Sequence, residues 1–433
     1  MTHLATLITD LALLLIVAGI TTLLCKRLKQ PTVIGYILAG FLIGPVVDFV
    51  PTVGDMANID LWAEIGVIFL MFALGLEFSL HKLASVGSTS FITAFVEVPG
   101  MLLTGFIAGK LLGWDTMNSI FLGGMLSMSS TMITIKAVED LGMKERRFTR
   151  LAVGTLVVED IVAIFLMVVL STVAVSQGVS GGELAGTIAQ LVFYLVLWLL
   201  LGIYLLPSFL KKVESLLSDE TLLVVSLGVC FGMVWLADAI GFSAALGAFL
   251  AGSILAGTSM QERIEHLVTP CKDLFGAVFF VSVGLKVNPA MLAEYLVPIV
   301  VLTLATIIGK VIFLMAGMLL AGEDLRTSLH GAFCLTQIGE FSFIIATLGI
   351  SLGVTADFLY PVIVAVSVIT TFTTPYLIKS ADRAAEALQR VLPAKWCAAI
   401  ERYDAEKHSA GVARDQDWQA FAKGYVSTFA LYG

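Results

Sequence analysis

Long apolar runs, separated by short polar, charged or glycine- and proline-containing segments, dominate the chain. A membrane-spanning helix needs about 20 mostly apolar residues, so the pattern predicts an all-α polytopic membrane protein with about 13 transmembrane helices. A transmembrane β-barrel would instead need short alternating segments, which the sequence does not show. The predicted spans are 4–25, 32–47, 61–79, 87–113, 117–138, 150–176, 184–210, 220–238, 241–257, 269–285, 290–320, 326–352 and 357–378.

Composition supports the membrane class. Hydrophobic residues make up 58% of the 433 positions and charged residues only 13%, with a mean hydropathy of +0.97. Soluble globular chains carry about 25% charged residues, so that class is excluded. The first apolar run lacks the basic start and the small-residue cleavage site of a signal peptide, and we expect it to stay as a helix. The five cysteines show no metal-binding spacing, and we expect no nucleic-acid partner.

Basic residues gather in alternate loops, and such loops face the cytoplasm in membrane proteins. We therefore expect a multi-pass protein of the cell inner (plasma) membrane with its N-terminus outside and its C-terminus in the cytoplasm. The basic loops contain Lys26, Arg27 and Lys29; Lys82; Lys144, Arg146, Arg147 and Arg150; Lys211 and Lys212; Arg263; and Arg326.

Two distant segments resemble each other. Residues 69–79 read FLMFALGLEFS and residues 279–289 read FFVSVGLKVNP, so both place Gly-Leu and a charge at the end of an apolar span. Seven predicted crossings separate the two segments, which would invert the second relative to the first. The alternative explanation is the chance recurrence of Gly, Ala and Leu in membrane spans. Inverted repeats are typical of secondary transporters, whose ion sites lie on discontinuous helices at the repeat interface.

Polar residues interrupt two predicted spans at the repeat spacing. The fifth span contains LSMSSTMITIKAVED (126–140), and the twelfth contains LTQIGEFSF (335–343). Both are predicted to be broken helices, whose hydroxyl and carbonyl groups could ligate a dehydrated cation. Ordinary hydrogen bonding of Ser and Thr to the helix is the alternative explanation. The polar residues of the breaks are Ser129, Ser130, Thr131 and Thr134 in the first, and Thr336, Gln337 and Glu340 in the second.

Glu159 and Asp160 lie inside the sixth span, and Lys310 lies inside the eleventh. Ionisable groups within a membrane mark functional sites, and Lys310 is the cationic partner that we expect for the two acids. We predict that Asp160 is the main ligand of an alkali cation, competing with protons, and that Ser130 and Thr131 assist it. Glu159 points about 100° away around the helix, so it either joins this site or pairs structurally with another helix. Adjacent carboxyl groups are expected to titrate as a coupled pair.

Other charged residues inside or near the predicted spans have more than one possible role. Glu340 could act as a gating or a structural acid, and Glu97 precedes Pro99, where it could cap a helix kink. Glu77 and Lys286 end their spans and are expected at the membrane interface. The alternative role of Lys310 is that of a structural counter-ion.

The sequence resembles the Kef-type branch of the monovalent cation:proton antiporters (the CPA2 family) over about residues 5 to 380. The resemblance lies in SSTMITIKAVEDLG (129–142), VVEDIVAIF (157–165), FSAALGAFLAGSILA (242–256), FFVSVGLKVN (279–288) and QIGEFSFI (337–344). It implies a sodium/proton antiporter-like fold in which spans five and twelve cross. It also implies a homodimer, and elevator-like exchange of K⁺, or else Na⁺, for protons.

The resemblance assigns the family aspartate to Asp160 and the family lysine to Lys310. The preceding residue is Gln in glutathione-gated members and Asp in electrogenic sodium antiporters, whereas Glu159 stands here, as in some bacterial potassium/proton antiporters. We expect residues 1–380 to form the membrane domain, with scaffold and ion-carrying helices interleaved, and residues 381–433 to form a cytoplasmic tail. That tail has no GxGxxG motif and is too short for a nucleotide-binding domain. Either a separate subunit regulates the protein, or the nucleotide-binding domain was removed, or no such domain exists.

Two other function classes are disfavoured by the sequence. A cation channel, including a ligand-gated K⁺ efflux protein, would need a continuous pore and a selectivity filter, and TVGYG is absent. An intramembrane enzyme would need a nucleophile with its base or a metal-binding set such as HExxH, and the sequence shows neither. We expect no enzymatic activity and no cofactor in this chain; K⁺ or Na⁺ and H⁺ would be the transported ions.

Overall fold

The computed structural model describes residues 3–28, 30–44, 52–77, 87–175, 216–240 and 243–391, with the single positions 210, 212 and 213. This part of the chain is almost entirely α-helical and contains no strand. Its helices are α1 (His3–Arg27), α2 (Thr32–Ile43), α3 (Met56–Glu77), α5 (Ser88–Leu111), α6 (Thr116–Ser127), α7 (Thr131–Asp140), α8 (Arg147–Val175), α10 (Asp219–Ala239), α11 (Ala244–Ala256), α12 (Gln261–Leu285), α13 (Pro289–Glu294), α14 (Leu296–Leu320), α15 (Leu325–Cys334), α16 (Glu340–Ser351) and α17 (Leu359–Val391).

The predicted all-α polytopic fold is confirmed. Every predicted span except 184–210 has a helix, or a pair of helices, at its place. That span lies outside the described residues apart from Leu210. In the described part of the chain, 9 helical segments are long and apolar enough to cross a membrane. Spans five and twelve are the pairs α6/α7 and α15/α16, so both predicted breaks are present.

Two predicted spans differ from the helices in extent. The span 290–320 divides at Tyr295 into α13 and α14, and α17 continues to Val391. Hydropathy detects only the apolar part of a helix, and the last turns of α17 bury just one face, through Ala381 and Ala385. Residues 381–391 therefore continue α17, and the rest of the predicted tail lies outside the described residues.

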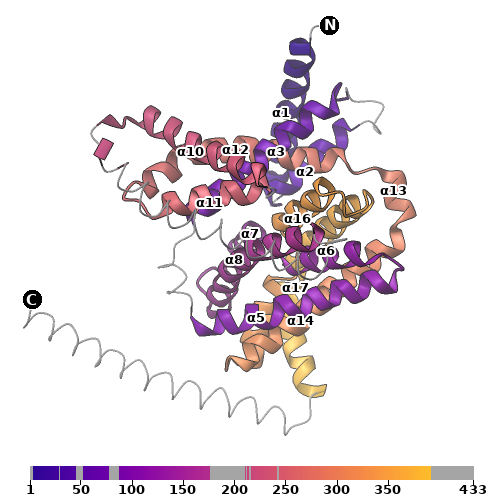
Figure 1. Cartoon of the computed structure of the whole chain (residues 1–433). Coiled ribbons are helices and arrows are strands. Elements are labelled where there is room, and N and C mark those ends of the chain that lie inside the picture. The colour runs from indigo at the N-terminus through magenta and orange to yellow at the C-terminus, as the bar shows by residue number, and fades with distance from the viewer. Residues whose placement is uncertain are drawn as a thin grey trace, which may run out of the picture.

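The helices form two groups, which are separate in Figure 1. One, here called the scaffold group, contains α1, α2, α3, α10, α11 and α12. The other, the core group, contains α5 to α8 and α14 to α17. The short helix α13 leads from the scaffold group to the core group along one edge. Each group combines helices from both halves of the chain, so neither is a continuous sequence domain.

The order of elements repeats, as the sequence predicts. Helices α1, α2, α3, α5, α6/α7 and α8 correspond in turn to α10, α11, α12, α14, α15/α16 and α17. Glycines join the two repeats at equivalent places: Gly40 of α2 packs on α12 at Gly284, and Gly252 of α11 packs on α3 at Gly75. A Cβ at any of these positions would overlap the facing backbone. Small residues allow this close helix packing, so the repeats interlock in the scaffold group.

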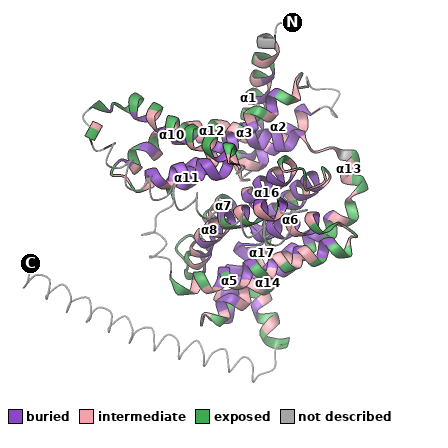
Figure 2. Ribbon diagram, viewed as in Figure 1, coloured by how far each residue is buried: buried purple, intermediate pink, exposed green. Residues whose placement is uncertain are grey.

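The outer surface of the helices is apolar. Phe95 and Leu111 of α5 are 84% and 83% exposed, and Trp235 of α10 is 69% exposed. Figure 2 shows such exposed positions along the outer sides of the groups, while buried positions concentrate where helices meet. An apolar exterior of this extent is unfavourable in water but suits lipid, which agrees with a multi-pass membrane protein.

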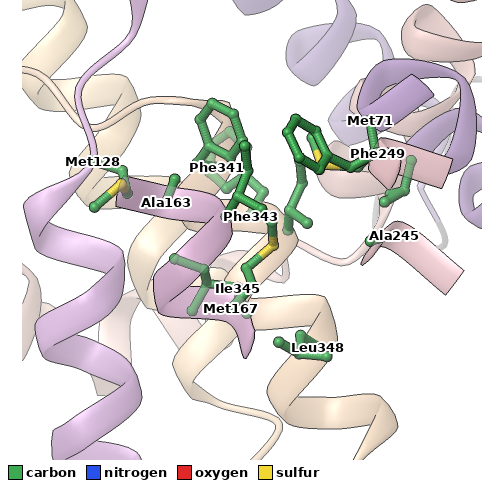
Figure 3. Packing of buried hydrophobic residues seen from close by; sticks show 14 of the residues in the cluster. Met71, Met128, Ala163, Met167, Ala245, Phe249, Phe341, Phe343, Ile345 and Leu348 are labelled. Atoms are coloured by element: carbon green, nitrogen blue, oxygen red, sulfur yellow. The ribbon is translucent and has the colours of Figure 1, made fainter. Parts of the chain in front are cut away.

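Apolar side chains form the contact between the two groups. Phe280 of α12 meets Phe343 of α16 edge-on, with ring centroids 6.4 Å apart. Figure 3 shows Phe341 and Phe343 on the core side and Met71 and Phe249 on the scaffold side. All of these residues belong to one buried apolar cluster. Contacts of this kind are non-directional, unlike the hydrogen bonds that hold the core group together.

Candidate functional site

The two helix breaks cross each other inside the core group. The backbone N–H of Gly339 donates to the carbonyl of Met128 at 2.8 Å, which joins the second break to the first. Gly339 lies so close to Ser129 that a Cβ would overlap its carbonyl oxygen. A residue larger than glycine would therefore separate the chains at the crossing, which explains the Gly at 339.

Side chains satisfy the backbone groups that the breaks leave free. Ser130 caps α7: its hydroxyl oxygen accepts from the N–H of Ile133, and the same hydroxyl donates to Glu340 Oε2 at 3.0 Å. Gln337 Nε2 donates to the Ser130 carbonyl at 2.9 Å and to Thr134 Oγ1 at 2.7 Å. Unpaired buried polar groups are costly, so this network stabilises two interrupted helices in an apolar environment.

Lys310 of α14 is fully buried beside the crossing. Its ammonium donates to Glu97 Oε1 at 2.7 Å, to Ser129 Oγ at 2.8 Å and to the Ser127 carbonyl at 3.1 Å. The Ser127 carbonyl ends α6, where the helix dipole favours a positive charge. Pairing of Lys310 with Glu159 or Asp160 was a wrong prediction, because Glu97 of the neighbouring helix α5 holds the ammonium instead.

The two adjacent acids of α8 have different surroundings. Glu159 is 1% exposed, and its Oε2 accepts from the backbone N–H of Ser129 at 2.9 Å. Glu159 is therefore attached to the first break on the Lys310 side. Asp160, one step around the helix, lines a cavity together with Glu340 and Glu77.

The cavity that Asp160 lines has a volume of about 380 Å³ and lies between the two groups. Here we call it the Asp160 cavity. Its core wall includes Asp160 of α8, Thr131 at the start of α7 and Glu340 at the start of α16. Helices α7 and α16 both begin at the crossing, so the positive ends of their dipoles lie at this wall. Its scaffold wall includes residues of α2, α3 and α12: Thr32, Tyr36, Glu77, Lys272 and Asp273.

The remaining predicted residues pack within the crossing and are not among the cavity's lining residues. Ser129 Oγ donates to the Leu335 carbonyl, and Thr134 Oγ1 donates to the Cys334 carbonyl at 3.0 Å. Thr336 Oγ1 lies 3.2 Å from Thr374 Oγ1 of α17. These side chains, like Gln337, hold the two breaks together and are positioned to support ion ligands.

Two charged residues at this centre were missed by the sequence reasoning. Glu97 was expected to cap a kink, but it pairs with Lys310. The two residues are 213 positions apart, which is close to the offset between the two repeats. Applying the repeat offset to Lys310 would have pointed to α5. Lys272 lies inside the predicted span 269–285, and its charge within that span was the signal that could have identified it.

The interlocked repeats, the two crossed broken helices and a carboxylate in a cavity between two helix groups define the fold class of ion-coupled secondary transporters. The chain belongs to the sodium/hydrogen exchanger family, since the model of that family's transmembrane region matches residues 12–379.

Individual relatives cover most of the chain. Protein YbaL of Escherichia coli (strain K12) is 35% identical over 367 residues, which is 82% of this chain and 64% of YbaL. The chain thus spans less than two thirds of that relative. The K(+)/H(+) antiporter subunit KhtU of Bacillus subtilis (strain 168) is 28% identical over 90% of this chain and 96% of its own length.

A solved structure shares the fold. The sodium proton antiporter MjNhaP1 from Methanocaldococcus jannaschii matches with a TM-score of 0.65 and 20% identity, over 88% of this chain and 98% of the other. At that identity the match establishes the fold alone. Together these comparisons agree with the antiporter-like fold and with the family resemblance seen in the sequence.

Proposed function

We propose that the chain exchanges a monovalent cation for protons across the membrane, with Asp160 carrying each ion in turn. The observation that carries this proposal is the position of Asp160, in a cavity between the two groups and beside the crossed breaks. A carboxylate and the Thr131 hydroxyl offer oxygen ligands to a dehydrated alkali cation. Protonation of the same carboxylate removes that site, so binding of the two ions is mutually exclusive.

The buried Glu97–Lys310 pair keeps a fixed role in this scheme. Its two charges cancel, and Lys310 also neutralises the negative end of α6. The pair therefore holds the first break in place while the charge at Asp160 changes. Ser129 extends this support to Glu159, because it bonds both Lys310 and Glu159.

Alternating access would come from movement of the core group against the scaffold group, in an elevator-like manner. The apolar contact between the groups supports this, because such surfaces can shift without breaking hydrogen bonds. The cavity lies toward the C-terminal end of α3 and along the middle of α12, from Lys272 to Phe280. At the opposite end of these helices, Lys286 bonds Asp60 at 3.0 Å and lies 5.5 Å from the Tyr360 ring centroid of α17.

The cavity would then be accessible from the cytoplasm. The segments that flank its entrance belong to the side of the basic loops, such as Lys26 and Arg27 before α2 and Arg263 in the first turn of α12. Cytoplasmic loops carry the excess of basic residues, so we place the C-terminus inside and the N-terminus outside the plasma membrane. K⁺ is our favoured cation, as in the name of KhtU, with Na⁺ as the other candidate.

Assembly belongs to the same proposal. We expect a homodimer formed through the scaffold group, whose helices α1 and α10 expose apolar side chains such as Leu23 and Trp235. KhtU is named as an antiporter subunit, which supports a separate regulatory subunit here. The chain would need no cofactor and catalyse no chemical reaction.

A cation channel, including a ligand-gated K⁺ efflux protein, is the second candidate. It would require a polar path through the whole membrane thickness. The Asp160 cavity is lined on the scaffold side by one end of α3, and Lys286, Asp60 and Tyr360 lie at the other end. Antiport is therefore the better explanation.

Exchange in proteoliposomes tests the proposal. With an imposed pH gradient and a pH-sensitive dye, addition of K⁺, Na⁺, Rb⁺ or Li⁺ to wild type should dissipate the gradient. Asp160→Asn should abolish this exchange while the protein remains folded, because the amide can neither bind a cation by charge nor exchange a proton at neutral pH. The matched control is Asp140→Asn, which removes a carboxylate paired with Lys136 on the surface of α7 and should leave exchange intact.

Two outcomes would oppose the proposal. Unchanged exchange by Asp160→Asn would remove Asp160 as the ion carrier. Conduction of K⁺ without any coupled proton movement would favour the channel.

A further inference from the structure

The Asp160 cavity contains an ammonium group among carboxylates. Its described lining includes four acidic residues and one lysine, Lys272. A positive charge repels a cation that enters the same cavity. Lys272 therefore affects how strongly the cavity binds a cation. The acidic residues are Glu77, Asp160, Asp273 and Glu340.

Lys272 is loosely held, in contrast to Lys310. Its Nζ lies 4.0 Å from Glu77 Oε1, and its side chain is 28% exposed. The buried Lys310–Glu97 pair is 2.7 Å long and has no exposure. An ammonium on a four-carbon stem is mobile, and a long, partly solvated ion pair restrains it little. Lys272 can consequently move within the cavity, whereas three hydrogen bonds hold Lys310 in place outside it.

The charge of Lys272 acts across the cavity. Lys272 belongs to the scaffold group, and it interacts electrostatically with Glu340 of the core group. Glu340 in turn lines the same core wall as Asp160, and its charge acts on Asp160. The hydroxyl of Ser130 also donates to Glu340, which fixes that carboxylate beside the start of α7. Lys272 of the scaffold wall thus acts on Glu340 of the core wall, which lies on the same wall as Asp160, the proposed ion carrier.

We propose that Lys272 is a counter-cation of the scaffold wall that competes with the transported cation for the carboxylates of the Asp160 cavity and so sets the apparent cation affinity. This rests on the proposed antiport function. When a cation enters, its charge replaces that of Lys272 near Glu340, and the ammonium turns back to Glu77. When the cation leaves, Lys272 restores the balance of charge.

Movement of the core group against the scaffold group would confine this competition to one of the two access states. Lys272 is on the scaffold group, and Asp160 and Glu340 are on the core group. A shift of the core group would carry its carboxylates away from Lys272. The competition would then act on the side where the cavity is accessible now and be lost on the other, which favours release of the cation on the Lys272 side.

Replacement of Lys272 tests the proposal in the full-length protein. Lys272→Gln should lower the KM for K⁺ about three- to tenfold in proteoliposomes, because removal of one positive charge from the cavity wall strengthens cation binding. The maximal rate should change much less. The assay uses an alkaline pH, where protons compete least, and N-methyl-D-glucamine holds the ionic strength constant. Thermal stabilisation of the purified protein by K⁺ measures binding separately, and its apparent Kd should fall with KM.

Three variants serve as controls. Lys272→Arg retains the charge and should behave as wild type. Lys272→Met retains the apolar stem and should match Lys272→Gln, which guards against a folding defect in one variant. Glu77→Gln removes a carboxylate from the same pair and should raise KM and Kd.

The outcomes separate this inference from the proposed function. Equal or higher KM and Kd in Lys272→Gln and Lys272→Met, relative to Lys272→Arg, would overturn the counter-cation role while leaving antiport intact. Absence of exchange in wild type, or full exchange in Asp160→Asn, would instead reject the antiport function, and the Kd series would still decide the role of Lys272.

Discussion

At the scale of single residues, the centre of the core group is a chain of charges connected through one serine. Lys310 bonds Glu97 directly and Ser129 Oγ, and the Ser129 N–H bonds Glu159. Glu97 and Lys310 both have no exposed side-chain surface. Each charge in such a pair depends on the other, because an isolated buried charge is far more costly than the pair.

This dependence predicts non-additive effects on stability. Glu97→Gln and Lys310→Met should each destabilise the protein strongly, by about 3–5 kcal/mol, because each leaves one buried charge unpaired. The double variant should be less destabilised than the sum of the two and recover part of the melting temperature. Thermal unfolding in detergent, followed by circular dichroism, measures all three.

Lys136→Met provides the control for this cycle. It makes the same Lys→Met change in an ion pair at the surface. Lys136 pairs with Asp140, and its side chain is 44% exposed. Its melting temperature should change little. A double variant exactly as unstable as the two single changes added together would contradict the pairing of Lys310 with Glu97.

At the scale of elements, the site depends on where helices stop. Four helix ends, those of α6, α7, α15 and α16, meet at one crossing, where Met128 and Gly339 are hydrogen-bonded. The breaks place the starts of α7 and α16 at the Asp160 cavity. The carbonyl end of α6 lies beside Lys310, and that of α15 lies within the crossing. Polar groups occur within the membrane here because the two interrupted helices satisfy each other.

The crossing leaves no room for a methyl group at position 339. Gly339→Ala should destabilise the protein and reduce exchange together, because the added Cβ would push the second break away from Ser129. Gly228→Ala in α10 is the matched control, since nothing lies within 4 Å of its Cβ position. It should be neutral or slightly stabilising. The measurements are the melting temperature and the exchange rate; identical values for both variants would show that the crossing tolerates separation.

At the scale of the whole molecule, the two groups meet through apolar side chains and a polar contact at the far end from the cavity. Along α3, Asp60 and Glu77 are about 25 Å apart by helix geometry. Lys286 contacts Asp60 within the scaffold group and the Tyr360 ring of the core group. This contact holds the groups together where the cavity does not reach.

Loss of that contact should shift the balance between the two access states. A cation–π contact contributes about 0.5–2 kcal/mol, so Lys286→Gln should change the ratio of states by roughly two- to thirtyfold. We expect a cysteine placed in the cavity, Ala73→Cys, to react more slowly with a membrane-impermeant maleimide from the basic-loop side. The experiment uses a background in which the native cysteines are replaced.

Lys110→Gln is the control for this shift. Lys110 lies 5.9 Å from the ring centroid of Phe106, but both residues belong to α5, so the contact does not join the groups. Its labelling rate should equal that of the parent. Equal rates for Lys286→Gln and Lys110→Gln would mean that the Lys286 contact does not hold the present state.

The sequence alone determined the membrane class, the approximate positions of the spans that the structure describes, the repeated order of elements and both helix breaks. These features follow from local patterns: a span is a run of apolar residues, and a break is a run of Ser, Thr, Gly and charge within it. Asp160 could likewise be singled out, because a charge within an apolar run is visible without any structure. The sequence could not tell which charged groups meet.

The tertiary structure alone decided the partners. Glu97 and Lys310 are 213 positions apart, and only the packing of α5 against α14 brings them together. Glu159 and Asp160 are neighbours in sequence, but a helix turns about 100° per residue, which sends one toward Ser129 and the other into the cavity. The cavity itself exists only between two helix groups whose members alternate along the chain, so Lys272 acquires its place opposite Glu340 through folding.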